Sequence, residues 1–555
     1  MAVSKGSKKR RPAGRLFSII LAIFENMKKF ISFFLVTILL ASCIAFAGIH
    51  GTAPSQIHPW WQDAIFYEVF VRSFNDSNGD GIGDFNGITK KLDYLKDLGI
   101  TALWLMPIFP SPSYHGYDVT DYFNANPQYG TLEDFKNLLS QAHQRGMHVI
   151  IDMVYNHTSD QNPWFVSANE DPQSPYRNWY IWSSTNPAYM GPLGVAWHPG
   201  KQGFYYAVYT GMPDLNYRNP AVTTEMNKVT SFWLKNIGVD GFRLDSIMYL
   251  IEEGQKQKNT KSTHDWLKKF YQTYKADNPI AFMVGEVGGA DAALAATYTG
   301  DQLDMAFEFE LATSFINSVN GGSNSSIDSA LSFAQQSLPT WQFASFLTNH
   351  DQPRTMTVLN GNVDKAKVAA FLLLTSPGTP FIYYGEEIGM EGDKPDPNIR
   401  TPMQWTDAAG AGFTSGMPWE SLGPNYQTAN VAAELNDPNS LLSFYHSMIA
   451  IHKQHPALRY GDLVLLSTGN PGVYGALRGS SSETLLILVN LTKSPIQAYD
   501  LSATGVNLAD GKYTLTALVG NGTAPTIIIQ KGAFADFKPA AEMPAFSTYL
   551  YKLTP

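Results

Sequence analysis

The chain has 555 residues, of which 44% are hydrophobic and 16% are charged, an ordinary composition for a globular protein with a large core. At this length we expect either two to four domains or one large barrel with attached domains. The formal net charge is −9 and no basic field lies outside the N-terminus, which argues against a nucleic-acid-binding protein.

The N-terminal segment has the layout of a secretory signal. The run "MKKFISFFLVTILLASC", residues 27–43, combines a positive start, an apolar stretch and small residues before Cys43, the only cysteine of the chain. Residues 40–43 resemble the lipobox of bacterial lipoproteins, in which the cysteine is lipidated. Residues 30–49 are also long enough to span a bilayer, which is the alternative. We favour a signal segment over residues 1–43, with translation starting at Met27, and a tether over residues 44–58.

From Trp60 onward, short apolar runs alternate with amphipathic helical stretches, the pattern of strand–helix units around a parallel sheet. Helical patterns include residues 131–146, where Thr131 and Asp134 suit a helix start and Gly146 its end. Eight runs are expected strands, and they begin at Ile65, Thr101, His148, Gly241, Phe282, Met305, Phe343 and Pro380. Eight such units predict an α/β fold, a (β/α)8 TIM barrel formed by residues 59–157 and 213–455.

Two segments depart from this alternation. Residues 158–212 are long, aromatic and loop-like, and we expect them to form a small domain, domain B, between the third strand and its helix. From residue 456 to residue 555, short strands alternate with Gly and Asn turns and no helical pattern, which predicts a C-terminal antiparallel β-sandwich.

Ionisable residues follow four of the predicted strands. In a TIM barrel these positions share one rim, where reactive side chains lie. Burying a charge is costly unless it is paired, so a single residue of this kind can be a cap or an ion-pair partner, but several of them converging on one rim indicate a functional site. The residues are His157, Arg243, Asp245, Glu286, His350 and Asp351.

Paired carboxyl groups on such a rim suit glycoside hydrolysis, which needs one ionised and one protonated carboxyl beside the bond. Arg243 and Asp245 alternate along one strand, so their side chains share a face and Arg243 favours the ionised form of Asp245. Glu286 follows an apolar run and faces that anionic neighbourhood, which favours a group that keeps its proton near neutral pH.

Several motifs, in this order, resemble the signature regions of the α-amylase family, glycoside hydrolase family 13. The resemblance covers nearly everything from Trp60 to the C-terminus. It implies that Asp245 is the nucleophile of a retaining mechanism, Glu286 the general acid and then base, and Asp351 a group that grips ring hydroxyls. The motifs are "DMVYNH" (152–157), "MPDLN" (212–216), "GFRLDS" (241–246), "GEV" (285–287) and "FLTNHD" (346–351).

The same resemblance implies contacts to the substrate. His157 and His350 would bind hydroxyls of one ring, and Arg243 would orient the nucleophile. The run "YHGYD", residues 114–118, matches the family motif whose second tyrosine, here Tyr117, stacks on the sugar; His115 and Asp118 are further candidates. Arg400, in "RTPMQW", would help close the far side of the pocket. A mechanism that retains the anomeric configuration also predicts that the two catalytic carboxyl groups lie about 5–5.5 Å apart.

The run "NDSNGDGIGDFNG", residues 75–87, is spaced like a calcium loop, with Asp76, Asn78, Asp80 and Asp84 supplying oxygen atoms. The bidentate Glu that normally closes such a loop is missing. In branches of the family this spacing holds one divalent cation together with a backbone carbonyl, here that of Ile82. We expect a structural Ca²⁺ site, with Mg²⁺ or a solvated acidic turn as alternatives.

The substrate is expected to be starch, maltodextrins or related malto-oligosaccharides, cleaved at α-1,4-glucosidic bonds. Ser246 is small where α-1,6-specific relatives carry a bulky Val, and the mixture of motifs resembles the group between α-amylases and oligo-1,6-glucosidases. An α-glucosidase, a transglycosylase that makes trehalose, and an inactive membrane-anchored barrel remain alternatives. Whether a second cation binds at Asn156 stays open. We expect an exported monomer, bound to a bacterial membrane through a lipid on Cys43, without a nucleic-acid partner.

Overall fold

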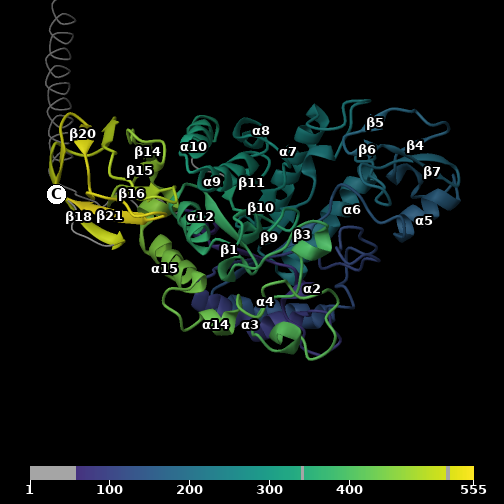
Figure 1. The fold of residues 1–555 in the computed structure, drawn as a ribbon. Helices are drawn as coiled ribbons and strands as arrows, with labels where there is room; N and C mark the ends of the chain where they lie inside the picture. Colours follow the sequence, from purple (N-terminus) through teal and green to yellow (C-terminus); the bar gives the residue numbers. More distant parts are fainter. Residues whose placement is uncertain (1–57, 339–342, 521–524) are drawn as a thin grey trace, which may run out of the picture. The chain divides into compact units, whose positions relative to one another are not determined.

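The computed structural model describes residues 58–338, 343–520 and 525–555; the predicted signal segment, Cys43 and residues 44–57 of the tether lie outside these ranges. Eight parallel strands close into a barrel in the order β1-β13-β12-β11-β10-β9-β3-β2 (Figure 1). All eight predicted runs coincide with these strands, so the TIM barrel is confirmed. The strands are β1 (Phe66–Val69), β2 (Ala102–Leu105), β3 (His148–Met153), β9 (Gly241–Leu244), β10 (Phe282–Gly285), β11 (Met305–Phe307), β12 (Phe343–Ser345) and β13 (Thr379–Tyr383).

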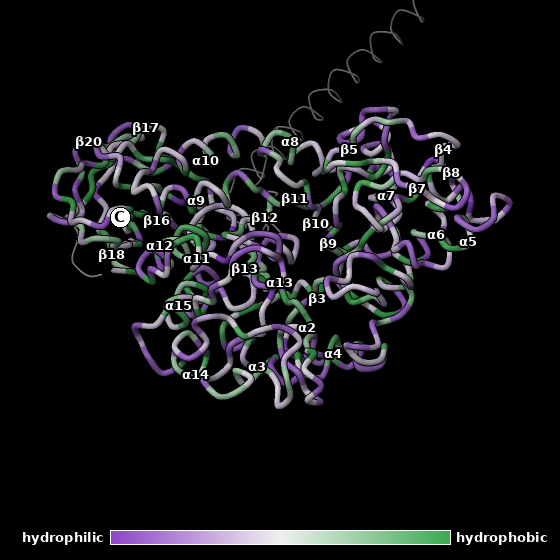
Figure 2. Tube along the Cα trace, turned by 45° about the vertical axis from the view of Figure 1, so that its right-hand side comes forward, coloured by the Kyte–Doolittle hydropathy of each residue, from purple (hydrophilic) through white to green (hydrophobic). Residues whose placement is uncertain are grey.

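The barrel strands are mostly apolar because both of their faces are buried. Alternate residues such as Phe66, Trp104 and Phe381 fill the interior, where the rings of Phe66 and Phe381 stack with centroids 4.2 Å apart. Their neighbours Tyr67 and Leu103 belong to the outer core beneath the helices. Figure 2 shows hydrophobic residues along the barrel strands and hydrophilic residues in the outer loops.

Helices surround the barrel and start and stop as their sequences dictate. Thr131 and Asp134 form the predicted capping box of α4, and Gly146 takes a left-handed φ of 76° just beyond its end. The long helices are α3 (Phe85–Leu98), α4 (Leu132–Gln144), α6 (Pro220–Ser231) with its π-helical extension η3 (Phe232–Ile237), α7 (Lys261–Asp277), α9 (Phe309–Gly321), α10 (Ser325–Ser337), α12 (Val363–Thr375) and α15 (Leu441–Gln454).

Short helical turns occupy the connections between these elements. Most are a single turn in length and serve to redirect the chain. They are η1 (Trp60–Asp63), α2 (Val71–Phe74), η4 (Ile247–Tyr249), α8 (Ala292–Ala296), α11 (Thr355–Val358), η6 (Glu386–Ile388), α13 (Asp396–Ile399), η7 (Ala409–Gly412) and α14 (Val431–Glu434).

The excursion between β3 and α6 forms a small domain built on a three-stranded sheet in the order β4-β8-β7. An antiparallel bridge between His157 and Asp214 closes its base, so the returning segment lies directly beside the residues that follow β3. Its elements are α5 (Pro163–Glu170), η2 (Arg177–Trp179), β4 (Trp182–Ser183), β5 (Met190–Gly191), β6 (Gly194–Val195), β7 (Trp197–Gly200) and β8 (Gly203–Tyr206).

The C-terminal region is an antiparallel sheet in the order β14-β15-β16-β21-β18-β19, with the separate pair β17-β20 and an apolar core of its own. A short helix that the sequence pattern did not predict, α16 (Pro456–Tyr460), precedes it, with Pro456 at the first helical position. The buried Arg478 donates to the carbonyl oxygens of Thr375 (2.8 Å) and Leu458 (3.0 Å), which ties the sheet to the end of α12. The strands are β14 (Asp462–Leu465), β15 (Val473–Gly479), β16 (Thr484–Asn490), β17 (Leu501–Thr504), β18 (Gly511–Val519), β19 (Ile527–Ile529), β20 (Ala533–Phe537) and β21 (Thr548–Thr554).

Within the described ranges no helix combines the length and the apolar character that crossing a bilayer requires.

Candidate active site

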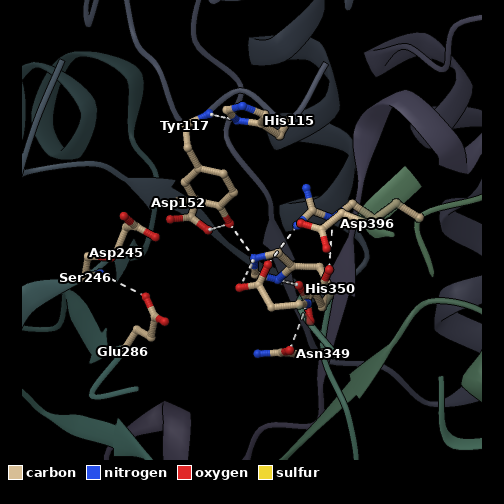
Figure 3. Close-up of polar contacts among 12 residues, drawn as sticks. His115, Tyr117, Asp152, Asp245, Ser246, Glu286, Asn349, His350 and Asp396 are labelled. Atoms are coloured by element: carbon tan, nitrogen blue, oxygen red, sulfur yellow. Dashed lines mark hydrogen bonds and ion pairs between the residues drawn. The ribbon is translucent and has the colours of Figure 1, made fainter. Parts of the chain in front are cut away.

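The carboxyl ends of the barrel strands bring the predicted residues to one rim, as expected for this fold (Figure 3). Asp245 follows β9, Glu286 follows β10, and His350 and Asp351 lie beyond β12. Most of these residues line a single cavity of about 200 Å³, smaller than the roughly 300–1,000 Å³ of pockets for drug-sized ligands. The cavity is lined by His115, Tyr117, His157, Tyr209, Met212, Asp245, Ser246, Glu286, Asp351, Asp396 and Arg400.

Arg243, on β9, joins three carboxylates beneath this cavity. Its side chain is only 1% exposed, and its Nη1 contacts Asp245 Oδ1 at 2.7 Å and Asp152 Oδ1 at 2.9 Å. Its Nη2 contacts Glu286 Oε2 at 3.0 Å. Because one planar guanidinium binds both Asp245 and Glu286 through adjacent nitrogens, the two carboxyl groups are held side by side. The predicted separation of 5–5.5 Å stays a prediction.

Glu286 is a carboxyl group of the cavity lining that can hold a proton near neutral pH. Burial raises its pKa to about 7; Arg243 opposes this, while the negative charges of Asp245 and Asp351 add to it. The backbone N–H of Ser246 donates to Glu286 Oε2 at 2.9 Å and fixes the direction of the side chain. Glu286 therefore exchanges its proton near neutral pH, as a group that acts both as acid and as base must.

Asp351 has the opposite character. The cleft walls raise its pKa by limiting its hydration, but His350 and Arg400 more than offset this and leave the pKa well below its ordinary value. Arg400 Nη2 contacts Asp351 Oδ1 at 2.7 Å, and His350 Nε2 contacts Asp351 Oδ2 at 3.2 Å. Asp351 is thus a fixed anion whose side chain remains 46% exposed to the cleft.

His350 is held as a cation within the barrel mouth. Burial lowers its pKa, but Asp351 and Glu68 raise it to about 9. Its Nδ1 lies 2.5 Å from Glu68 Oε1, on β1, and its Nε2 lies 2.7 Å from the hydroxyl of Tyr117. Tyr117 also donates to Asp152 Oδ2 at 3.1 Å, so its ring is fixed at the wall of the cavity.

The remaining predicted contacts differ in their placement. His157 lines the cavity, and its buried Nε2 has no hydrogen-bond partner in the described parts of the chain, so it is available to a ligand hydroxyl. His115 also lines the cavity, and its Nδ1 accepts from the backbone N–H of Tyr117 at 3.1 Å. Asp118 lies outside the lining, where its carboxylate accepts from the hydroxyls of Ser111 and Ser113.

Several site residues were not among the sequence predictions. Glu68 and Asp152 lie inside strands and support His350 and Arg243; an acid within an apolar strand was the signal that could have found them. Asp396, which pairs with Arg400 at 3.1 Å, and Tyr209, Met212 and Ser246 also line the cavity. Ser246 was considered from the sequence only for its small size. Tyr209 and Met212 come from the long loop between β8 and α6, and Asp396 begins the single-turn α13; no local pattern reveals the course of either segment.

The acidic loop after β1 is curled by successive side-chain-to-backbone hydrogen bonds. The N–H groups of Asn78, Asp80 and Ile82 each donate to the side chain two residues earlier, at 2.8–2.9 Å. No group of three or more His, Cys, Asp or Glu side chains suited to a metal occurs in residues 58–338, 343–520 and 525–555, so donors here would include an amide and a carbonyl. The hard oxygen donors of the loop fit Ca²⁺ in chemical type.

Residues 68–461 match the family model described as "Alpha amylase, catalytic domain". The chain is 42% identical to alpha-amylase 3 of Dictyoglomus thermophilum over 452 residues, covering 80% of this chain and 87% of the relative. It is 34% identical to an oligo-1,6-glucosidase of Parageobacillus thermoglucosidasius (79% and 91% covered). It is 35% identical to the trehalose synthase/amylase TreS of Mycolicibacterium smegmatis (80% and 86% covered).

Among solved structures, an α-amylase from H. orenii superposes with a TM-score of 0.76 at 37% sequence identity, covering 88% of this chain and 99% of that chain.

Proposed function

The chain belongs to the α-amylase family of glycoside hydrolases and transglycosylases, and we propose that it hydrolyses α-1,4-glucosidic bonds in starch-derived chains by double displacement. One observation carries the proposal: a single buried guanidinium holds Asp245 beside Glu286, and Glu286 carries a proton near pH 7. Retaining glycosidases require such a pair, one carboxylate that attacks and one carboxylic acid that protonates.

In the first step Asp245 attacks the anomeric carbon while Glu286 protonates the leaving oxygen, which gives a covalent glycosyl–enzyme and a free chain end. Glu286 is then ionised and accepts a proton from the water that attacks the same carbon, releasing the sugar with its configuration retained. Asp351, fixed by Arg400 and His350, is placed to bind hydroxyls of the reacting ring. The unpaired Nε2 of His157 offers a further contact.

The α-1,4 preference is supported by Ser246, which lines the cavity next to the nucleophile and leaves space that a larger residue would fill. The test is the product profile from maltoheptaose compared with maltose. An amylase-type enzyme shortens maltoheptaose into several products. Consumption of maltose with maltoheptaose left intact would instead identify an α-glucosidase, and formation of a new disaccharide from maltose would identify a transglycosylase.

We also propose that the loop over residues 76–84 holds one structural Ca²⁺, with oxygen ligands from Asp76, Asn78, Asp80 and Asp84 and the carbonyl of Ile82. The proposal is supported by the oxygen donors at alternate positions. The same loop is bound to residues 413–419, because Thr414 Oγ1 donates to Asp76 Oδ2 at 2.5 Å and Trp419 N donates to Gly81 O at 2.9 Å. A cation there would stabilise this side of the rim and take no part in bond cleavage.

Export and lipid attachment at Cys43 are proposed from the signal-like residues 27–43. In bacterial cells grown with a radiolabelled fatty acid, the label should enter the wild-type chain and be lost in Cys43→Ser. Equal labelling of both chains would contradict lipidation at this residue.

A further inference from the structure

Tyr209 reaches from domain B to the residue that follows the nucleophile. It lies in the loop between β8 and α6, and its turn is fixed by a hydrogen bond from Met212 N to Tyr209 O at 3.0 Å. Its hydroxyl shares a 2.9 Å hydrogen bond with Ser246 Oγ. This contact joins the domain B excursion to the end of β9 within the cavity itself.

Ser246 adopts a backbone conformation that non-glycine residues seldom take. Its φ is 50° and its ψ is 33°, the left-handed region, which persists only where the surroundings enforce it. This conformation aims the Ser246 N–H at Glu286 Oε2, 2.9 Å away. The side chain of Ser246 is thus bound on one side by Tyr209, and its backbone binds the acid on the other.

We infer that Tyr209 is a positioning residue for Glu286: its hydroxyl holds Ser246 so that the Ser246 N–H stays aimed at the carboxyl group of the acid. Tyr209 then acts through Ser246 and makes no bond to the reacting atoms. The inference deepens the proposed function, on which it rests for the kinetic part of its test. It also gives domain B a role in setting the protonation of the catalytic acid.

The groups that face Glu286 come from every side of the rim. Arg243 and Asp245 approach from β9, Asp351 from the segment after β12, and Tyr209 from domain B. Tyr249, on η4, is also close enough to be influenced by its charge. Of these neighbours, Arg243 and the Ser246 N–H favour the ionised carboxylate, and the two aspartates oppose it. Loosening the contact between the Ser246 N–H and Glu286 therefore favours the protonated form of Glu286.

The test compares Tyr209→Phe and Ser246→Ala with wild type in the pH dependence of kcat/KM for maltoheptaose. This profile reports the ionisation of the free enzyme, and its alkaline limb follows the loss of the proton from Glu286. Both variants should move that limb upward by about 0.5 to 1 pH unit, since the backbone N–H of residue 246 is held less firmly toward the carboxylate of Glu286. The double variant should show no greater shift than either single variant, because both changes break the same link.

Tyr206→Phe is the matched control. Tyr206 lies at the end of β8 in the same domain and also loses one hydroxyl hydrogen bond, the 2.8 Å contact to Gln257 Oε1. The alkaline limb of the kcat/KM profile of Tyr206→Phe should coincide with that of wild type. If Tyr209 only supports the fold, Tyr209→Phe will lower the melting temperature or kcat and leave the limb in place. An unmoved limb in both Tyr209→Phe and Ser246→Ala, or shifts that add in the double variant, overturns the inference.

A direct titration separates this inference from the proposed function. The carboxyl carbon of Glu286 is followed by carbon-13 NMR in protein labelled at glutamate, with Glu286→Gln used for assignment. A higher pKa of Glu286 in Tyr209→Phe supports the inference even if the wild type cleaves no α-glucan, a result that would contradict the function alone. An unchanged pKa overturns the inference whatever the activity.

Discussion

The raised pKa of Glu286 predicts that the catalytic acid lowers the stability of the folded protein above neutral pH. Burial and the nearby Asp245 raise this pKa from 4.5 to about 7. A carboxyl whose folded pKa lies above its unfolded value contributes stability that is complete below pH 4.5 and is lost as the pH rises to about 7. At 1.36 kcal/mol per pKa unit, the loss is about 3 kcal/mol.

Glu286→Gln removes this titration and keeps an oxygen that can accept from Ser246 N. With an unfolding entropy of roughly 2.1 cal/mol/K per residue, the free energy of unfolding of the 555-residue chain changes by ~1.2 kcal/mol for each kelvin near the melting temperature. A difference of ~3 kcal/mol therefore corresponds to ~3 °C. We therefore expect the variant to melt about 3 °C above wild type at pH 8 and at the same temperature at pH 4, while its activity falls by orders of magnitude. Scanning calorimetry at the two pH values measures the difference. Equal offsets at both pH values, or a variant less stable at pH 8, would refute the assigned pKa.

Three further changes test other parts of the site. Asp245→Asn should lower the release of reducing sugar from maltodextrin by about 10⁴-fold or more, since a nucleophile is lost, with an unchanged circular dichroism spectrum; activity near wild type would exclude Asp245 as the nucleophile. Asp351→Asn removes a negative charge that raises the pKa of Glu286, so the alkaline limb of kcat/KM should move to lower pH, and a shift to higher pH would contradict this electrostatic picture. Chelation of Ca²⁺ should lower the free energy of unfolding of the wild type by about 2.7 kcal/mol relative to Ca²⁺ at 100 times its dissociation constant, which is ~2 °C in melting temperature. Asp80→Ala should abolish this response. Equal responses in both proteins would place the ion elsewhere.

The barrel could be predicted because its strands carry a strong local signal. Parallel strands covered on both faces are continuous apolar runs, and turn residues such as Gly146, just before β3, mark where a run begins. The reactive residues could be predicted for the same reason, since Asp245 and Glu286 stand directly after such a run and Asp351 lies six residues beyond the end of β12. The apolar run of a strand and the ionisable residue that follows it lie within about ten consecutive residues.

The partners of those residues could not be predicted from local patterns. Glu68 and His350 are 282 positions apart and meet only because β1 and β12 both open onto the same rim. Tyr209 and Asp396 depend on the path of long loops over the cavity, where neither helical nor strand periodicity applies. The helix over residues 456–460 was missed because a single turn has too few residues to show a period.

The balance of charge at the rim explains why these supporting residues matter for the proposed chemistry. Arg243, Arg400 and the protonated His350 provide three positive charges, and they are in contact with six acids: Glu68, Asp152, Asp245, Glu286, Asp351 and Asp396. When Glu286 holds its proton, five carboxylates face three cations, and two negative charges are left in excess. A surplus of this sign stabilises positive charge as it develops on the sugar in an oxocarbenium-like transition state. The same surplus opposes loss of the proton from Glu286, so the arrangement that stabilises the transition state is also the one that keeps this acid protonated.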